Sequence, residues 1–301
     1  MTMADVVHGK LRVGRQARTF TVRLPREAPP NAVVLLLHGN HPEADGQQMR
    51  EWTGFDRQAD TWGLAVAYPD GHEGSWADGR GVTRADEAGV DDVAFLRAII
   101  DWSADHYGTF PDRAIVAGIS NGGFMTHRMA VEASDQVAVL AAVAGQMPAS
   151  LVEVTPSHAV SAILIHGSAD SVAPIAGGYS RHRGPNGELR GRALSLDESA
   201  ARWRAIDRCP PGPGQTHATE LSRRHTSPAG AGGTRVIEWT VFGGGHTWPG
   251  APVPPEVTEP VSMEFDTAEE ICRLARPLLI EASERRLRRI FPSVRPTNGS
   301  S

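Results

Sequence analysis

Short runs of apolar residues recur along the chain and alternate with segments in which apolar positions return every three or four residues. The runs predict seven strands, at residues 19–24, 32–37, 64–68, 113–117, 137–143, 161–165 and 235–241. Residues 19–24 alternate in polarity, which is typical of an edge strand with one buried face. Residues 32–37 are apolar throughout, as expected of a central parallel strand covered on both faces.

The intervening segments have helical periodicity. They predict helices over residues 90–107, 121–134 and 196–208, and either one long helix or two over residues 266–290, broken near Pro277. Strands that alternate with helices indicate an α/β fold, with a mostly parallel central sheet flanked by helices on both faces.

We expect one domain over residues 1–290. Two stretches rich in Gly, Pro and Arg interrupt the alternation: residues 176–192, expected near a pocket mouth, and residues 209–234, expected to form a surface loop. Residues 291–301 are expected to form a flexible C-terminal tail.

Composition excludes several classes of protein. Of 301 residues, 40% are apolar and 22% are charged, which is ordinary for a globular protein and excludes a coiled coil or a collagen-like fibre. The net charge of −5 gives no electrostatic reason to expect nucleic-acid binding. No run of 18 apolar residues is present, so no membrane span is expected. The sequence carries no signal for an oligomeric state.

The N-terminus and the cysteines both bear on the cellular compartment. The first ten residues contain an acid and no apolar segment of the secretory type, and Cys209 and Cys272 are too few for a disulfide framework. A cytoplasmic location is therefore expected, although a processed secreted chain would look the same.

The strongest chemical signal is Gly118-Ile119-Ser120-Asn121-Gly122, between an apolar strand and a predicted helix. Gly-x-Ser-x-Gly at such a junction is the nucleophile elbow of the α/β-hydrolase fold, in which a tight turn presents the serine hydroxyl at the end of the sheet. Two glycines around a serine also occur in ordinary turns, but the strand–turn–helix context favours catalysis.

A serine nucleophile needs a base to remove its proton and an acid to orient that base. In this fold the chain order is Ser, then Asp or Glu, then His. Asp170 follows the predicted strand 161–165, and His246 follows the predicted strand 235–241. Both lie where the carboxyl ends of parallel strands gather, so we predict a triad of Ser120, Asp170 and His246.

Other acids and histidines fit less well. His166 lies on a strand and is expected to bond to the neighbouring loop, whereas Glu153 follows no identifiable strand end. Asp207 falls on a helical pattern and is expected to be solvated. Four histidines in loops without a preceding strand are interpreted as surface residues: His158, His182, His217 and His225.

The oxyanion hole requires backbone N–H groups aimed at the developing negative charge. We expect one from Asn121, directly after the nucleophile, and one from Asn40, in the loop after residues 32–37. His38 has no partner at metal-ligand spacing, the cysteines match no zinc pattern, and no phosphate-binding glycine motif is present. No metal or other cofactor is expected.

Trp76 and Trp248 lie in loops at strand ends and are candidates for lining a substrate pocket. Simple packing within the loops is an equally good interpretation of both. The shape of the pocket is expected to depend on the loops 71–89, 145–158 and 176–192.

Taken together, these motifs resemble the polyhydroxybutyrate depolymerase and feruloyl esterase-like α/β-hydrolases. The resemblance runs from about residue 17 to 275 and is carried by these blocks: Leu37-His38-Gly39, Tyr68-Pro69-Asp70-Gly71, Ser75-Trp76-Ala77-Asp78-Gly79, Val90-Asp91-Asp92-Val93-Ala94-Phe95, Gly118-Ile119-Ser120-Asn121-Gly122-Gly123 and Gly243-Gly244-Gly245-His246-Thr247-Trp248-Pro249-Gly250. It implies Ser120, Asp170 and His246 as the triad.

The chain also departs from that family. Asn40 stands where members often have a cysteine, and Cys209 lacks the partner some twenty residues later that members often have. No separate polymer-binding module is present, which argues against attack on a solid polymer.

The leading hypothesis is a serine esterase acting on short hydroxyacyl esters, such as 3-hydroxybutyrate oligomers, or on hydroxycinnamoyl esters. A serine peptidase of the same fold is an alternative, and so is a non-catalytic relative that binds a small molecule. The intact triad argues against the last of these.

Overall fold

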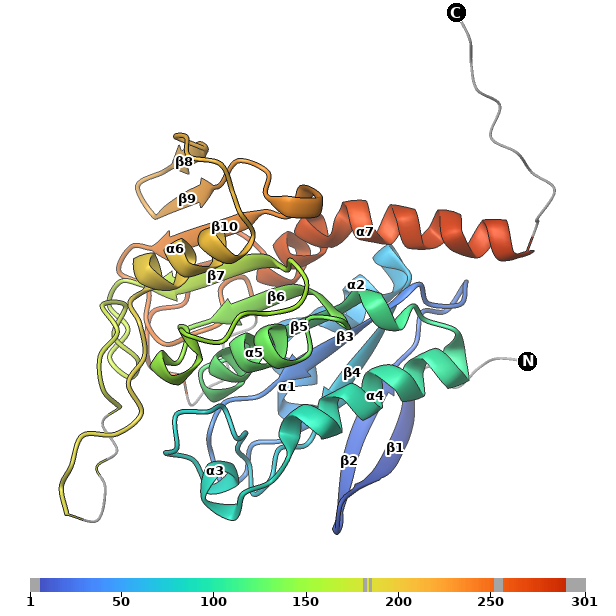
Figure 1. The fold of residues 1–301 in the computed structure, drawn as a ribbon, viewed down its shortest axis with the longest axis horizontal. Coiled ribbons are helices and arrows are strands. Elements are labelled where there is room, and N and C mark those ends of the chain that lie inside the picture. Colours follow the sequence, from blue (N-terminus) through green and yellow to red (C-terminus); the bar gives the residue numbers. More distant parts are fainter. Residues whose placement is uncertain (1–5, 181–182, 184–185, 252–256, 291–301) are drawn as a thin grey trace, which may run out of the picture.

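A computed structural model describes residues 6–180, 183, 186–251 and 257–290. Within these residues the strands form a ten-stranded sheet in the order β1-β2-β4-β3-β5-β6-β7-β10-β9-β8 (Figure 1). The expected tail, residues 291–301, lies outside the described residues. No helix in the described part of the chain is both long and apolar enough to cross a bilayer.

The centre of the sheet is parallel. Six neighbouring strands run in one direction: β4 (Leu64–Pro69), β3 (Ala32–Leu37), β5 (Ala114–Ile119), β6 (Val137–Val143), β7 (Ser161–Gly167) and β10 (Val236–Val241). These are the apolar runs of the sequence, with ends shifted by at most two residues. They are apolar because both faces of each strand are covered.

Each face of the sheet packs against three helices (Figure 1). Helices α4 (Asp92–Tyr107), α5 (Asn121–Glu132) and α6 (Leu196–Ile206) contribute to one core. Helices α1 (Gly46–Thr53), α2 (Phe55–Trp62) and α7 (Thr267–Ile290) contribute to the other. In β3, Val33, Leu35 and Leu37 enter the first core and Ala32, Val34 and Leu36 the second. The α/β-hydrolase architecture expected from the sequence is therefore confirmed.

Antiparallel strands complete both edges of the sheet. At one edge β2 (Gln16–Arg23) pairs with β4 and with β1 (Val6–Val13). At the other edge β9 (Ser222–Thr226) pairs with β10 and with β8 (Gln215–Ala218). The interpretation of residues 209–234 as a loop is corrected here, because β8 and β9 extend the sheet.

The helices differ in detail from the sequence pattern. The carboxylate of Asp91 caps α4 by accepting from the backbone N–H of Ala94, which is why the helix begins at Asp92. Residues 267–290 form one helix that contains Pro277, so the long-helix alternative is correct. Helices α1 and α2, and the short α3 (Arg84–Ala88), were not evident as periodic apolar patterns.

Candidate active site

Ser120 occupies a strained turn between β5 and α5. Its φ of 55° and ψ of −121° lie in a backbone region that residues other than glycine rarely adopt. The turn is tight because a Cβ on Gly122 would collide with the carbonyl oxygen of Leu37, and one on Gly118 would lie 2.6 Å from the carbonyl carbon of Gly122. Only glycine at these positions lets strand and helix approach this closely, as the elbow geometry requires.

Asp170 and His246 are in direct contact, although 76 residues separate them in sequence. They follow β7 and β10, which are adjacent in the sheet. Nδ1 of His246 lies 2.8 Å from Oδ2 of Asp170 and donates to the carboxylate, which leaves Nε2 as the atom that can accept a proton. This is the orientation that a base in an acyl-transfer triad requires.

Asp170 is held as a carboxylate by several donors. Its Oδ1 accepts from the backbone N–H groups of Val172 and Ala173, at 2.8 Å and 2.7 Å. Burial opposes its ionisation, but hydrogen bonds from His166 and His246 outweigh that cost and hold the pKa of Asp170 below its usual range. The carboxylate is therefore available to stabilise an imidazolium at His246.

His166 is part of this network. Its Nε2 lies 2.7 Å from the carbonyl oxygen of Ala173 and 3.1 Å from Oδ2 of Asp170. The bond to the loop agrees with the sequence interpretation, but the contact with Asp170 was not anticipated. Its four-residue separation from Asp170 at the end of β7 is the only local signal for that contact.

Glu259 connects the loops that carry Asp170 and His246. Its carboxylate accepts from the backbone N–H of His246 and from the hydroxyl of Ser171, the residue after Asp170. Sequence reasoning missed Glu259 because it follows no strand and belongs to no motif.

The loop that carries Asn40 lies beside the nucleophile. A Cβ built on Gly39 would lie 3.6 Å from Cβ of Ser120. Nδ1 of His38 donates to the carbonyl oxygen of Gly39 at 2.7 Å, and Nε2 accepts from the N–H of Gly71 at 2.9 Å. Burial lowers the pKa of His38, which suits the neutral ring that these bonds require. His38 therefore supports the loop.

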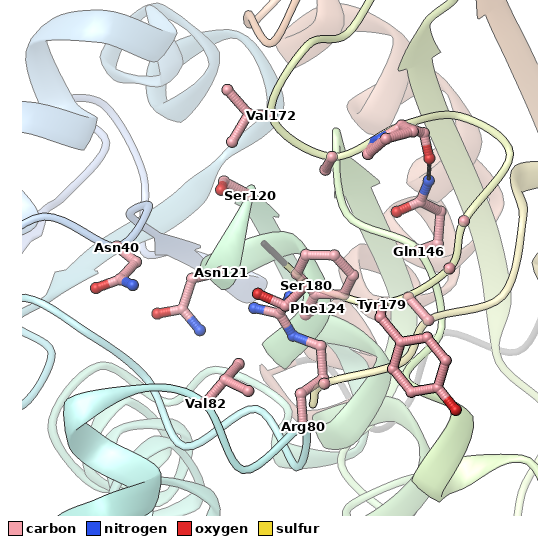
Figure 2. A pocket seen from close by; sticks show the side chains of 16 residues that line it. Asn40, Arg80, Val82, Ser120, Asn121, Phe124, Gln146, Val172, Tyr179 and Ser180 are labelled. Carbon is pink, nitrogen blue, oxygen red and sulfur yellow. Dashed lines mark hydrogen bonds between the residues drawn. The ribbon is translucent and has the colours of Figure 1, made fainter. Parts of the chain in front are cut away.

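Asn40 and Asn121 both line the cavity that contains Ser120 (Figure 2). The N–H of Asn121 is at the first position of α5, where backbone donors lack partners within the helix. The side chain of Asn40 is held by Arg84, whose Nη2 donates to Oδ1 at 2.9 Å. Both residues therefore border Ser120, and their role as oxyanion-hole donors stays a prediction.

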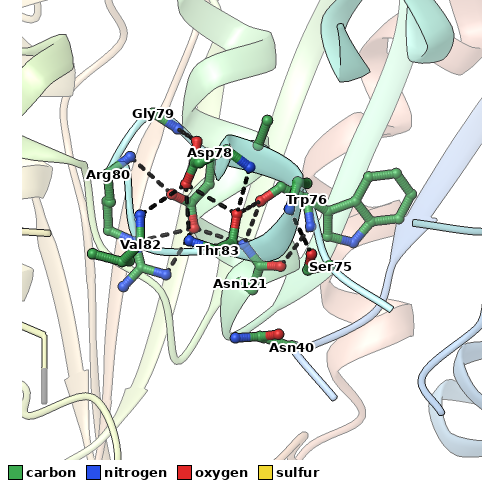
Figure 3. A network of polar contacts seen from close by, with 12 residues as sticks. Asn40, Ser75, Trp76, Asp78, Gly79, Arg80, Val82, Thr83 and Asn121 are labelled. Atoms are coloured by element: carbon green, nitrogen blue, oxygen red, sulfur yellow. Dashed lines mark hydrogen bonds and ion pairs between the residues drawn. The ribbon is translucent and has the colours of Figure 1, made fainter. Parts of the chain in front are cut away.

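Trp76 is fully buried and does not line this cavity. Its Nε1 donates to the carbonyl oxygen of His38 at 3.0 Å, and its backbone N–H donates to Oδ1 of Asn121 at 2.7 Å. The expectation that Trp76 contacts substrate is therefore corrected: its indole packs against His38, in the loop that carries Asn40. Figure 3 shows its backbone beside Asn121. Trp248 and His246 together line a second, smaller cavity of about 50 Å³.

The cavity beside Ser120 has a volume of about 290 Å³. Its walls include Arg80 and Val82 from the loop 71–89, Gln146 from the loop 145–158, and Tyr179 from the stretch 176–192. These are the three loops expected to shape the pocket. Val172 and Ala173, which hold Asp170, contribute to the same wall.

No protein-family model matches the chain. A protein of Nocardia uniformis subsp. tsuyamanensis named "Putative esterase NocK" is 31% identical over 294 residues, which cover 88% of this chain and 79% of that protein. Poly(3-hydroxyalkanoate) depolymerase C of Paucimonas lemoignei is 25% identical over 254 residues, which cover 77% of this chain and 58% of that protein.

A shorter match covers part of the chain. The bifunctional acetylxylan esterase/xylanase XynS20E of Neocallimastix patriciarum is 30% identical over 129 residues, or 42% of this chain and 18% of that protein. Among solved structures, an acetyl xylan esterase from Aspergillus awamori superimposes with a TM-score of 0.56 at 16% identity, over 80% of this chain and 94% of that chain. At this identity the match shows a similar fold and nothing further.

Proposed function

The chain belongs to the esterase family that includes the relative from Nocardia uniformis, and we propose that it hydrolyses carboxylic esters with Ser120 as the nucleophile and His246 and Asp170 as its base and acid. The observation that carries the proposal is the 2.8 Å hydrogen bond between His246 and Asp170, at the end of the sheet where Ser120 occupies its strained turn.

The reaction then has two halves. Oγ of Ser120 attacks the ester carbonyl while Nε2 of His246 takes the hydroxyl proton, and the backbone N–H groups of Asn40 and Asn121 bind the oxyanion. The tetrahedral intermediate expels the alcohol, which receives the proton from His246. Water attacks the acyl-enzyme with His246 again as base, and the acid is released with Ser120 regenerated.

The proposed substrates are esters of short hydroxyacyl groups or of hydroxycinnamoyl groups. A cavity of about 290 Å³ beside Ser120 is at the small end of ligand pockets, which favours an acyl group of this size over a long fatty chain. The match to a poly(3-hydroxyalkanoate) depolymerase supports the first of these classes.

The test is hydrolysis of p-nitrophenyl butyrate by the purified protein and by Ser120→Ala. We expect turnover by the wild type and a fall in kcat of several powers of ten in the variant, with little change in thermal unfolding. Equal rates in both proteins would contradict the role of Ser120. Cleavage of peptidyl anilides without any ester turnover would favour a peptidase instead.

A further inference from the structure

Two polar side chains in the cavity beside Ser120 take no part in the proposed chemistry. Arg80 comes from the loop between β4 and α3, and Gln146 from the loop after β6 (Figure 2). Each side chain is held by hydrogen bonds from part of its polar group. Another polar atom of the same group makes no hydrogen bond to the residues that the structure describes.

Arg80 is fixed by a fully buried carboxylate. Its Nε and Nη2 donate to Oδ2 of Asp78 at 3.0 Å and 2.7 Å (Figure 3). Its guanidinium carbon lies 3.6 Å from the centre of the Phe124 ring. Oδ2 of Asp78 also accepts from Nδ2 of Asn121 at 2.6 Å, so the same carboxylate holds the residue after the nucleophile. Within the described part of the chain, Nη1 of Arg80 donates to no protein group.

Gln146 presents the opposite polarity. Its side chain is buried, and its Nε2 donates to the carbonyl oxygen of Pro174 at 2.8 Å. Because a carbonyl oxygen can only accept, this bond decides which end of the amide is nitrogen. Oε1 is therefore turned away from Pro174, on the cavity side (Figure 2), and accepts no hydrogen bond from the residues that the structure describes.

A free donor and a free acceptor in one cavity match a group that can both accept and donate. A hydroxyl is such a group, because it can accept from Nη1 of Arg80 or donate to Oε1 of Gln146. A carboxylate fits less well, because Oε1 would repel it and Asp78 already neutralises Arg80. An ammonium group fits less well too, because it can only donate and so cannot accept from Nη1 of Arg80.

The side of the ester that enters this cavity follows from the proposed function, on which this inference rests. His246 must protonate the leaving alcohol, and it lines the second cavity together with Ile119, Thr247 and Trp248. The larger cavity contains Ser120, Asn40 and Asn121, which would bind the carbonyl. We propose that Arg80 and Gln146 form a subsite for a hydroxyl group on the acyl portion of the substrate.

The experiment compares substrates that differ by one hydroxyl. The pairs are p-nitrophenyl 3-hydroxybutyrate with p-nitrophenyl butyrate, and methyl p-coumarate with methyl cinnamate; p-nitrophenyl hydrogen succinate serves as the carboxylate probe. We expect the wild type to favour the hydroxylated member of at least one pair by about tenfold or more in kcat/KM, which is the size of effect that a charge-assisted hydrogen bond provides.

The variants are Gln146→Leu, which removes the acceptor, and Arg80→Lys, which keeps the charge but not the second arm of the guanidinium. Both should bring the ratio of the two kcat/KM values towards one. Arg97→Lys is the matched control, because Arg97 lies on α4, pairs with Asp135 and does not line the cavity. It should keep the wild-type ratio. If Arg80→Lys fails to fold because Asp78 is buried, Gln146→Leu still decides the question.

Three outcomes would overturn the subsite and leave the proposed esterase activity standing. They are ester turnover with no preference for the hydroxyl, a preference that Gln146→Leu leaves unchanged, and a preference for the succinate ester. Failure of the wild type to hydrolyse any ester would overturn the proposed function, and the subsite with it.

Discussion

Nε2 of His166 lies 3.1 Å from Oδ2 of Asp170, the oxygen that also accepts the hydrogen bond from His246. His166 therefore helps to fix the same carboxylate oxygen that orients the base. Because its Nε2 also approaches the carbonyl oxygen of Ala173 at 2.7 Å, it must carry a proton on that nitrogen whatever its charge.

His166→Phe should lower kcat by roughly tenfold with little change in KM, because the loss of this donor lets the Asp170 carboxylate rotate away from His246. His166→Gln is the matched control, since its amide can still donate at the same distance along the side chain. Steady-state kinetics on p-nitrophenyl butyrate check both variants. A larger loss in the Gln variant than in the Phe variant would show that ring packing, and not the hydrogen bond, is what matters.

Asp170→Asn should lower kcat by roughly 10³- to 10⁴-fold, because an amide can donate to Nδ1 of His246 and so favour the wrong tautomer of the ring. The fold should survive, since the amide oxygen can still accept from the backbone of Val172 and Ala173. Kinetics together with circular dichroism provide the measurement. Near-normal activity would mean that another acid orients His246.

Glu259→Ala should lower kcat by about tenfold or more, because the loops carrying Ser171 and His246 lose the carboxylate that holds them together. Glu259→Gln should retain most of the activity, since the amide oxygen can accept from His246 while the amide nitrogen donates to Ser171. Thermal unfolding of both variants separates loop positioning from general stability. Activity in Glu259→Ala that matches the wild type would exclude a positioning role.

Asp207 affords a test based on pH. It is fully buried at the end of α6, where its Oδ1 accepts from the N–H of Val160 at 3.0 Å, which corrects the expectation that it is solvated. Burial raises the pKa of Asp207 to about 7. Between about pH 4 and pH 7 the unfolded chain has lost this proton and the folded chain keeps it, so this group's contribution to stability falls as the pH rises through that range.

Asp207→Asn should remove this dependence and should raise the free energy of unfolding at pH 8 by about 1 to 3 kcal/mol relative to the wild type. The difference should shrink at pH 5, where folded Asp207 is already neutral. Urea unfolding at both pH values makes the comparison. A variant that is equally destabilised at both pH values would show that the carboxyl is ionised in the folded protein.

Local pattern predicted the central strands well. Residues 32–37 and 137–143 were located to the residue, because a strand buried on both faces must be apolar throughout. The hairpin of β8 and β9 was missed because its edge strands are polar and carry no alternation, and they pair only because β10 offers a free edge. Helix α1 was missed because it buries little besides Met49.

The sequence by itself determined the fold class, the elbow at Ser120, and the order in which an acid and a histidine follow it, because each depends on residues that are neighbours along the chain. Tertiary structure alone decided that Trp76 is buried, that His166 and Glu259 support the Asp170–His246 pair, and that Arg80 and Gln146 share a cavity with Ser120. These contacts join residues from separate loops, and no local periodicity encodes which loops the folded sheet brings together.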